Sequence, residues 1–289
     1  MPYLDPVARD IYFRCWDVPD PIAVAVFAHG FGEHLDLYGG LAAALGGQGI
    51  ELWGVELPGH GRSAGRRGIV PLDAGVEAID RQAAPAHAAR DRVRLVAMGH
   101  SLGAVVVSAA VVRGRVPADA MLLSAPPLDG VTMADLGSLT QPSADPFYLD
   151  QLANDPYAFP MRDAFEPLIQ TITTAMPELH AGLPRLGIPV GLVSGNLDPF
   201  CTPAVSARWS GLIPTASALV VDGDHHDVLN DIRHRDTEAA VAGFILSGRL
   251  SESPQPRAAP LRRRGRGTSA SASLPHRSPR GSAGRPSGS

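Results

Sequence analysis

One stretch of the sequence decides the fold: Val93-Arg94-Leu95-Val96-Ala97-Met98-Gly99-His100-Ser101-Leu102-Gly103, continued by Ala104-Val105-Val106-Val107-Ser108-Ala109-Ala110. The apolar, β-branched run predicts a buried strand, and the Ala- and Val-rich segment predicts a helix. A Gly-x-Ser-x-Gly pattern between a strand and a helix is typical of a nucleophile elbow, a tight turn that tolerates only small neighbours around the serine. The alternative is a glycine-rich loop with an incidental serine. The flanking strand and helix favour the elbow, with Ser101 as the nucleophile.

The elbow also predicts an oxyanion hole. At the start of the helix, the backbone N–H of Leu102 has no partner within the helix and can face a developing oxyanion. A second donor is expected from the loop after an earlier strand, His29-Gly30-Phe31-Gly32. The backbone N–H of Phe31 is the candidate, because glycines on both sides let the chain pass close to a substrate. A tight turn at His29-Gly30 is compatible with the same role.

The rest of the chain predicts an α/β fold with a mostly parallel, twisted sheet flanked by helices, because apolar runs recur after helix-length spacers. Besides the elbow strand and helix, strands are expected at 9–16, 22–28, 50–55, 120–124, 189–194 and 218–222. Helices are expected at 37–45, from 73 onward with Pro85 bending or ending the helix, at 203–212 and at 237–246.

The alternation of predicted strands and helices is interrupted between residues 128 and 187, where Pro, Asp and aromatic residues are frequent and no strand-like run occurs. We therefore expect a core made of 1–127 and 188–250, with 128–187 as an inserted cap, or lid, over the strand ends. The alternative is a long connection without function, which is uncommon. Six side chains of this insert could line an acyl tunnel or simply pack the insert onto the body: Phe147, Tyr148, Leu149, Tyr157, Phe159 and Phe165.

Composition and length limit which classes of protein this chain can belong to. The 289 residues suffice for one large α/β domain or two small ones. No run approaches the ~20 apolar residues of a membrane span. Residues 1–6 lack the basic and apolar regions of a secretory signal, and two cysteines do not make a disulfide framework. These features predict a cytoplasmic protein; the oligomeric state stays open.

Charge is distributed unevenly along the chain. The net charge is −4, and all 25 basic residues are arginine. Eight of them lie in 251–289, a Ser-, Pro-, Gly-, Arg- and Ala-rich tail that we expect to be disordered because it has almost no large apolar residues to bury. The body is acidic, so no nucleic-acid partner is expected. The arginines could give weak contact with an anionic membrane surface, but the tail has no amphipathic periodicity or aromatic residue, which favours a solvated extension.

A serine nucleophile needs a base, and the base needs an orienting acid. In an elbow-bearing fold these follow the nucleophile in the order Ser, Asp, His, each after a later strand. Asp198 follows the apolar run 190–194, and His226 follows the run 218–221. Asp222, Asp224, His225 and Asp227 are competitors. The cluster 224–227 also contains metal-ligand types, but adjacent residues rarely ligate one ion together, so no metal and no cofactor are expected.

Four motifs in this order resemble the monoacylglycerol lipase and lysophospholipase branch of the α/β-hydrolases. They are His29-Gly30-Phe31-Gly32-Glu33-His34, Pro58-Gly59-His60-Gly61-Arg62-Ser63, Gly99-His100-Ser101-Leu102-Gly103 and Asn196-Leu197-Asp198-Pro199-Phe200-Cys201. The segment 223–231 is similar to that branch's Gly-x-x-His-x-x-x-Asn-Glu, with Asp231 in place of Glu. The resemblance implies His226 as the base and a thiol, Cys201, near the acid and the pocket.

The resemblance, together with the serine, acid and base, predicts a serine hydrolase that cleaves carboxylic esters through an acyl-enzyme. A small ester or lipid, of monoacylglycerol or lysophospholipid type, is the expected substrate and partner. The alternatives are a thioesterase, a small-ester carboxylesterase, a carbon–carbon bond hydrolase, or a non-catalytic binder on the same fold. A dehalogenase or epoxide hydrolase is disfavoured, because those enzymes carry a carboxylate where Ser101 stands.

Overall fold

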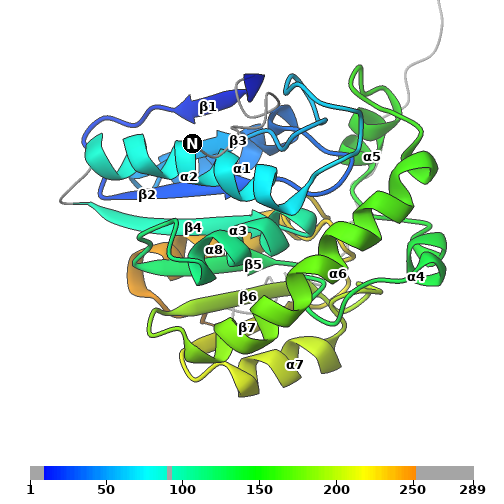
Figure 1. Cartoon of the computed structure of the whole chain (residues 1–289). Coiled ribbons are helices and arrows are strands. Elements are labelled where there is room, and N and C mark those ends of the chain that lie inside the picture. Colours follow the sequence, from blue (N-terminus) through cyan, green and yellow to red (C-terminus); the bar gives the residue numbers. More distant parts are fainter. Residues whose placement is uncertain (1–9, 90–92, 252–289) are drawn as a thin grey trace, which may run out of the picture. The chain divides into compact units, whose positions relative to one another are not determined.

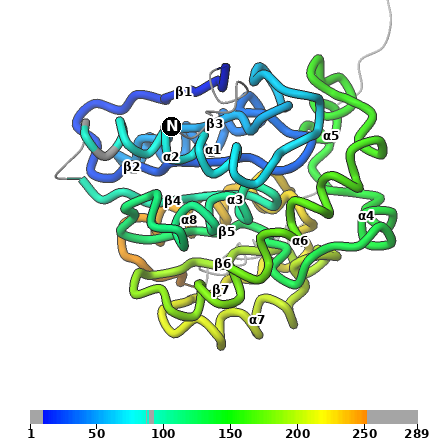
Figure 2. Tube along the Cα trace, in the orientation of Figure 1, coloured from blue at the N-terminus to red at the C-terminus, as the bar shows by residue number. Residues whose placement is uncertain are grey.

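A seven-stranded sheet runs through the middle of the fold (Figures 1 and 2). The structure is a computed structural model that describes residues 10–89 and 93–251. The strands are β1 (Phe13–Trp16), β2 (Ala23–Ala28), β3 (Ile50–Val55), β4 (Arg94–His100), β5 (Ala120–Ser124), β6 (Val190–Gly195) and β7 (Ala216–Val221), in the order β1-β3-β2-β4-β5-β6-β7. Among these described strands, β1 alone pairs antiparallel, with β3. The predicted mostly parallel sheet is confirmed.

Helices cover both faces of the sheet. They are α1 (Gly39–Gly46), α2 (Leu72–Ala89), α3 (Leu102–Val112), α4 (Met133–Ser138), α5 (Pro146–Ala153), α6 (Phe165–Gly182), α7 (Pro203–Leu212) and α8 (His234–Ser247). Alternate residues of a strand point to opposite faces. In β2, Val24 and Val26 join one apolar cluster with α2, α3, α6 and α7, while Ala25 and Phe27 join a second cluster with α1 and α8. The two cores therefore hold the central strands rigidly from both sides.

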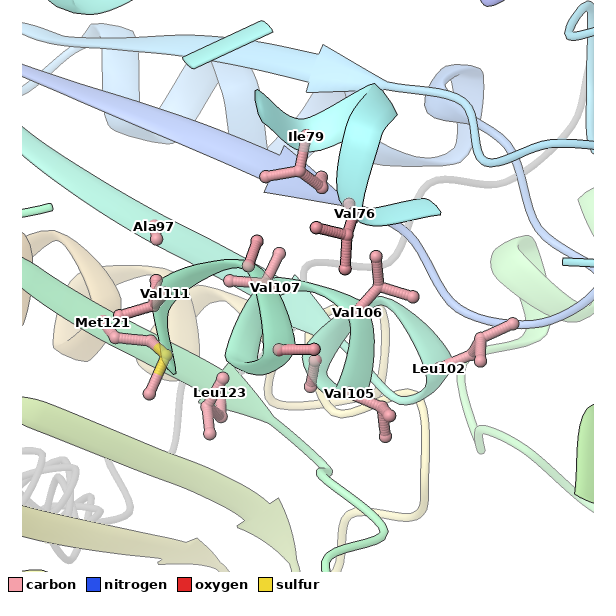
Figure 3. Close-up of a cluster of buried hydrophobic side chains, with 14 of the residues drawn as sticks. Val76, Ile79, Ala97, Leu102, Val105, Val106, Val107, Val111, Met121 and Leu123 are labelled. Atoms are coloured by element: carbon pink, nitrogen blue, oxygen red, sulfur yellow. The ribbon is translucent and has the colours of Figure 1, made fainter. Parts of the chain in front are cut away.

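Helix α3 is buried along its whole length from Leu102 to Val111. Figure 3 shows its valines beside Val76 and Ile79 of α2. A helix that is apolar on every side is typical of a core position, and each buried valine contributes about 1.5–3 kcal/mol relative to an exposed one. Because α3 cannot shift without disturbing this core, its first turn is a fixed platform for Ser101.

The boundaries of two predicted helices differ from expectation. Of the two outcomes expected at Pro85, a bend or an end of the helix, the end is wrong, because α2 continues to Ala89. A proline removes the hydrogen bond to the carbonyl four residues earlier, here that of Arg81, and both residues are exposed, so water can satisfy that carbonyl. The helix expected at 37–45 is divided into the 3₁₀-helix η2 (Leu35–Tyr38) and α1.

The segment between β5 and β6 is mainly helical. It contains α4, α5, the 3₁₀-helix η3 (Met161–Ala164), α6 and the 3₁₀-helix η4 (Leu183–Arg185). Figure 1 shows α4 and α5 beyond the carboxyl ends of the parallel strands, which the arrowheads mark. The buried residues of α6 recur at helical spacing, at Leu168, Ile172, Ala175 and Leu179, and they pack in the same core cluster as α2 and α3. This amphipathic pattern is the signal for α6 that the frequent prolines obscured.

Two predictions concern segments outside the described ranges. The disordered tail expected at 251–289 lies outside them except for Ser251, and so does Arg9 at the start of the first expected strand. Within the described ranges, none of the helices combines the length and the apolar character that crossing a bilayer requires.

Candidate active site

The chain turns sharply at Ser101, between β4 and α3. Its φ of 50° and ψ of −118° lie in a region that side-chain-bearing residues rarely adopt. A Cβ at Gly99 would collide with the backbone of Gly103, and a Cβ at Gly103 would collide with the carbonyls of Ala28 and His29. The Gly-x-Ser-x-Gly pattern is therefore required by the local geometry, and the turn holds the Ser101 hydroxyl at the start of α3.

His226 lies between Ser101 and Asp198. Its Nε2 is 2.8 Å from Ser101 Oγ, and its Nδ1 is 3.0 Å from Asp198 Oδ2. Asp198 follows β6 and His226 follows β7, at neighbouring strand ends. At the end of β6, a Cβ on Gly195 would collide with the backbone of Asp224, so a glycine is needed for the two loops to meet. The structure thus brings together three side chains that are far apart in the sequence.

The two charged partners stabilise each other in a buried setting. Burial alone would raise the pKa of Asp198, but the His226 imidazole and the N–H groups of Phe200 and Cys201, at 2.8 and 3.1 Å, hold that pKa below its usual range. Burial alone would lower the pKa of His226, but the Asp198 carboxylate, followed by Asp227 and Glu33, raises it. The lowered pKa keeps Asp198 as a carboxylate, and the raised pKa lets the His226 imidazole accept a proton readily.

Of the competing residues in the last loop, Asp222, His225 and Asp227 have other hydrogen-bond partners. His225 turns to Asp231, which accepts from its Nδ1 at 3.0 Å and also from its backbone N–H. Asp222 is exposed and accepts from Asn196 Nδ2 at 2.6 Å. Asp224 is fully buried, and burial raises its pKa to about 7. None of these residues is within hydrogen-bond distance of Ser101 in the part of the chain that the structure describes.

The loop after β2 lies against the elbow. A Cβ on Gly30 would be 2.8 Å from His100 Cδ2 and 3.2 Å from Ser101 Cβ. His29 is buried and its pKa is lowered by burial, so the ring is neutral; its Nδ1 is 2.7 Å from Gly30 O, and its Nε2 accepts from Leu57 N. Anchoring the Gly30 carbonyl turns the N–H of the same peptide group, that of Phe31, to the opposite side. Within the described ranges, that N–H makes no hydrogen bond.

A cavity of about 250 Å³ opens at Ser101 and His226. Its wall includes Phe31 and Phe200 from the body. The segment between β5 and β6 supplies most of the apolar lining: Leu136, Leu139, Leu152, Ala158, Phe159, Met161, Phe165 and Leu168. Of the six insert side chains singled out in the sequence, only Phe159 and Phe165 line it; Phe147 is 72% exposed, and Tyr148 is buried. An apolar chamber that ends at a serine hydroxyl suits an acyl chain.

One group of metal-ligand types lies within this site. Ligand atoms of His100, His226 and Asp227 lie within 4.8 Å of one another. Both ring nitrogens of His226 are already engaged by Ser101 and Asp198, however, so a metal would have to break that hydrogen-bonded chain. A second group, Cys15, Asp17 and Glu51, lies at β1 and β3, where Glu51 accepts from Trp53 Nε1.

Four polar residues next to the catalytic side chains contact one another in a way that the sequence did not indicate. Glu33, His100, Tyr148 and Asp227 are all buried and hydrogen-bonded in a single chain of contacts. Glu33 and His100 belong to motifs quoted from the sequence, but Tyr148 lies in α5, 115 positions from Glu33. Only the three-dimensional structure reveals that pairing.

A serine on a strand-to-helix elbow, with a carboxylate and a histidine at later strand ends of a mostly parallel sheet, defines an α/β-hydrolase. Residues 19–142 match the family described as "Serine aminopeptidase, S33". The chain is 31% identical over 257 residues to a monoacylglycerol lipase of Mycolicibacterium smegmatis (strain ATCC 700084 / mc(2)155), covering 79% of this chain and 89% of that protein. It therefore belongs to the α/β-hydrolase superfamily, in the branch that includes the monoacylglycerol lipases, and is a carboxylic ester hydrolase.

Solved structures share the same fold. A monoacylglycerol lipase of Paleococcus ferrophilus superposes with a TM-score of 0.69 at 22% identity, covering 82% of this chain and 99% of that chain. A thermostable carboxyl esterase of Bacillus coagulans, in complex with glycerol, superposes with a TM-score of 0.69 at 16% identity, covering 84% of this chain and 96% of that chain. At these identities the similarity concerns the fold alone.

Proposed function

We propose that this protein hydrolyses lipid esters of the monoacylglycerol or lysophospholipid type, with Ser101 as nucleophile, His226 as general base and acid, and Asp198 as the orienting acid. One observation carries the proposal: the hydrogen-bonded chain from Ser101 Oγ through His226 to Asp198 opens into a cavity with mostly apolar walls. The name of the Mycolicibacterium smegmatis relative supports the same substrate class.

In the first half of the reaction, Ser101 Oγ attacks the ester carbonyl while His226 Nε2, 2.8 Å away, takes the hydroxyl proton. The Asp198 carboxylate accepts from Nδ1 and stabilises the imidazolium that forms. The N–H groups of Phe31 and Leu102 bind the oxyanion of the tetrahedral intermediate. His226 then gives its proton to the leaving alcohol, and the acyl group remains on Ser101.

In the second half, water attacks the acyl-enzyme with His226 again as base, and the fatty acid leaves. The segment 128–187 acts as the cap in this proposal, because its side chains supply most of the apolar wall next to Ser101. An acyl chain packed among Leu136, Phe159 and Phe165 would be shielded from water, which also strengthens the hydrogen bonds at the oxyanion.

The test is a rate survey with p-nitrophenyl esters, monoacylglycerols and lysophospholipids of increasing acyl length. The proposal predicts that kcat/KM rises with acyl length until the cavity is filled, and that a long-chain monoacylglycerol or lysophospholipid is turned over. A maximum at acetyl esters, with no turnover of either lipid, would favour a small-ester carboxylesterase. A preference for acyl thioesters over the matched oxygen esters would favour a thioesterase.

A further inference from the structure

One hydroxyl from the insert reaches the back of the catalytic site. Tyr148, in α5, is only 3% exposed. Its Oη lies 2.8 Å from Glu33 Oε1 and 2.9 Å from Asp227 Oδ2. These two carboxylates are themselves buried, at 5% and 7% exposure, and they come from opposite ends of the sequence. A buried carboxylate without a donor is costly, so the phenol stabilises both loops that carry them.

Glu33 connects this hydroxyl to the loop of the oxyanion hole. Its Oε2 accepts from Gly30 N at 2.6 Å and from Tyr38 Oη at 2.6 Å. Gly30 immediately precedes Phe31, whose N–H is the proposed oxyanion donor. A shift of the Glu33 carboxylate would therefore turn the backbone on the N-terminal side of that donor.

Asp227 connects the same hydroxyl to the base and to the nucleophile. It follows His226 directly, and its Oδ1 lies 3.3 Å from His100 Nε2. His100 precedes Ser101, and its Nδ1 lies 3.1 Å from Ser124 Oγ at the end of β5. The rings of His100 and His226 have centroids 5.2 Å apart. Asp227 thus contacts His100, the residue before the nucleophile, and directly follows the base His226.

Tyr148 has one proton for these two acceptors. Burial and the nearby Asp227 and Glu33 carboxylates raise its pKa well above the ordinary value, so the group remains a phenol and donates to one carboxylate at a time. The Tyr148 ring is also part of the apolar cluster that includes residues of α1 and α8, and this packing fixes the ring. A fixed donor shared by two acceptors couples the positions of those acceptors.

We infer that Tyr148 is a positioning residue for ester hydrolysis, one that couples helix α5 of the insert to the oxyanion loop through Glu33 and to the base through Asp227. The inference rests on the proposed roles of Ser101, His226 and Phe31. It assigns the insert a part in the chemical step in addition to lining the cavity. Leu152, one turn further along α5, lines the cavity, so an occupant of the cavity contacts the helix that carries this hydroxyl.

The test is Tyr148→Phe in the full chain, which removes the hydroxyl and keeps the ring. With p-nitrophenyl acetate, a substrate too short to fill the cavity, we expect kcat to fall about tenfold while KM stays the same. A role limited to attaching the insert predicts a different result: kcat for the acetate is unchanged at temperatures well below Tm, and KM rises only for long-chain esters.

Tyr38→Phe is the matched control. Tyr38 is also fully buried and also donates to Glu33, but it belongs to η2 of the body and makes no hydrogen bond to Asp227 among the described residues. Tyr38 shares only the Glu33 half of the coupling. We therefore expect a loss of Tm similar to that of Tyr148→Phe and a loss of kcat smaller than that of Tyr148→Phe. Equal kcat in Tyr148→Phe and wild type, or equal losses in the two variants, would overturn the inference. Ser101→Ala separates the two proposals: if it remains fully active, the proposed function itself is wrong.

Discussion

Replacing Asp198 with Asn tests how the acid controls the base. Asp198 Oδ1 accepts two backbone N–H groups, from Phe200 at 2.8 Å and Cys201 at 3.1 Å. In the variant, the amide oxygen must keep this position, so the NH2 group takes the place of Oδ2 and faces His226 Nδ1. The NH2 group donates, which makes Nδ1 an acceptor and puts the ring proton on Nε2. Nε2 then faces Ser101 with a proton and cannot accept another.

The expected loss in kcat is about 10⁴-fold, the magnitude that the same change causes in a Ser-His-Asp protease with intact geometry. The assay is turnover of a soluble p-nitrophenyl ester, with Tm measured in parallel to show that the variant is folded. Asp222→Asn is the matched control, because Asp222 is an exposed carboxylate at the neighbouring strand end that accepts from Asn196 Nδ2 and makes no hydrogen bond to His226 in the described ranges. We expect the control to remain within about twofold of wild type.

The pH profile gives the same experiment a second readout. His226 must be neutral to accept the Ser101 proton, so kcat/KM rises with pH through the pKa of His226. Because Asp198 raises that pKa, the acid limb of the wild type lies above the ordinary histidine value of ~6.5. Without the carboxylate, the limb of Asp198→Asn moves to lower pH. A variant that keeps more than a tenth of wild-type kcat, with an unmoved limb, would refute Asp198 as the orienting acid.

Further predictions follow from the burial and contacts of single side chains. His226→Ala abolishes ester turnover, whereas His225→Ala costs far less because His225 is held by another carboxylate; the reverse order would exclude the assigned base. Cys201 resists maleimide in the native protein, since burial raises the pKa of its thiol to about 12. The partly exposed Cys15 is labelled under the same conditions. Peptide mapping that finds both cysteines modified at equal rates would contradict this. Phe165→Ala shifts the acyl-length preference toward longer chains in the same rate survey, and an unchanged preference would remove this side chain from acyl binding.

The sequence predicted the parts of the site that depend on local pattern and chain order. The elbow needs glycines at fixed positions around Ser101, so the pattern itself carries the geometry. Asp198 and His226 each follow an apolar run that is a parallel strand, and the carboxyl ends of parallel strands meet at one edge of a sheet. These rules led to the three side chains that the structure brings within hydrogen-bond distance.

The rest could not be predicted, because it depends on contacts between distant segments. Chain order alone does not separate the adjacent His225 and His226; the family resemblance, not a physical rule, implied His226. The partners of Tyr148 lie 115 and 79 positions away in the sequence, without any periodic pattern that links them. The resemblance implied a thiol near the acid and the pocket; Cys201 lies beside Asp198, but only 1% of its surface is exposed and it is not among the residues that line the cavity.

Covalent labelling with a fluorophosphonate, located by peptide mass spectrometry, tests the central claim most directly. Such a probe reacts with a serine only when a base activates the hydroxyl and an oxyanion hole receives the phosphonyl oxygen. We predict one adduct per chain, on Ser101, with labelling lost in Ser101→Ala and in His226→Ala. An adduct on a different serine, or no adduct on a folded wild-type protein that hydrolyses esters, would contradict the proposed mechanism.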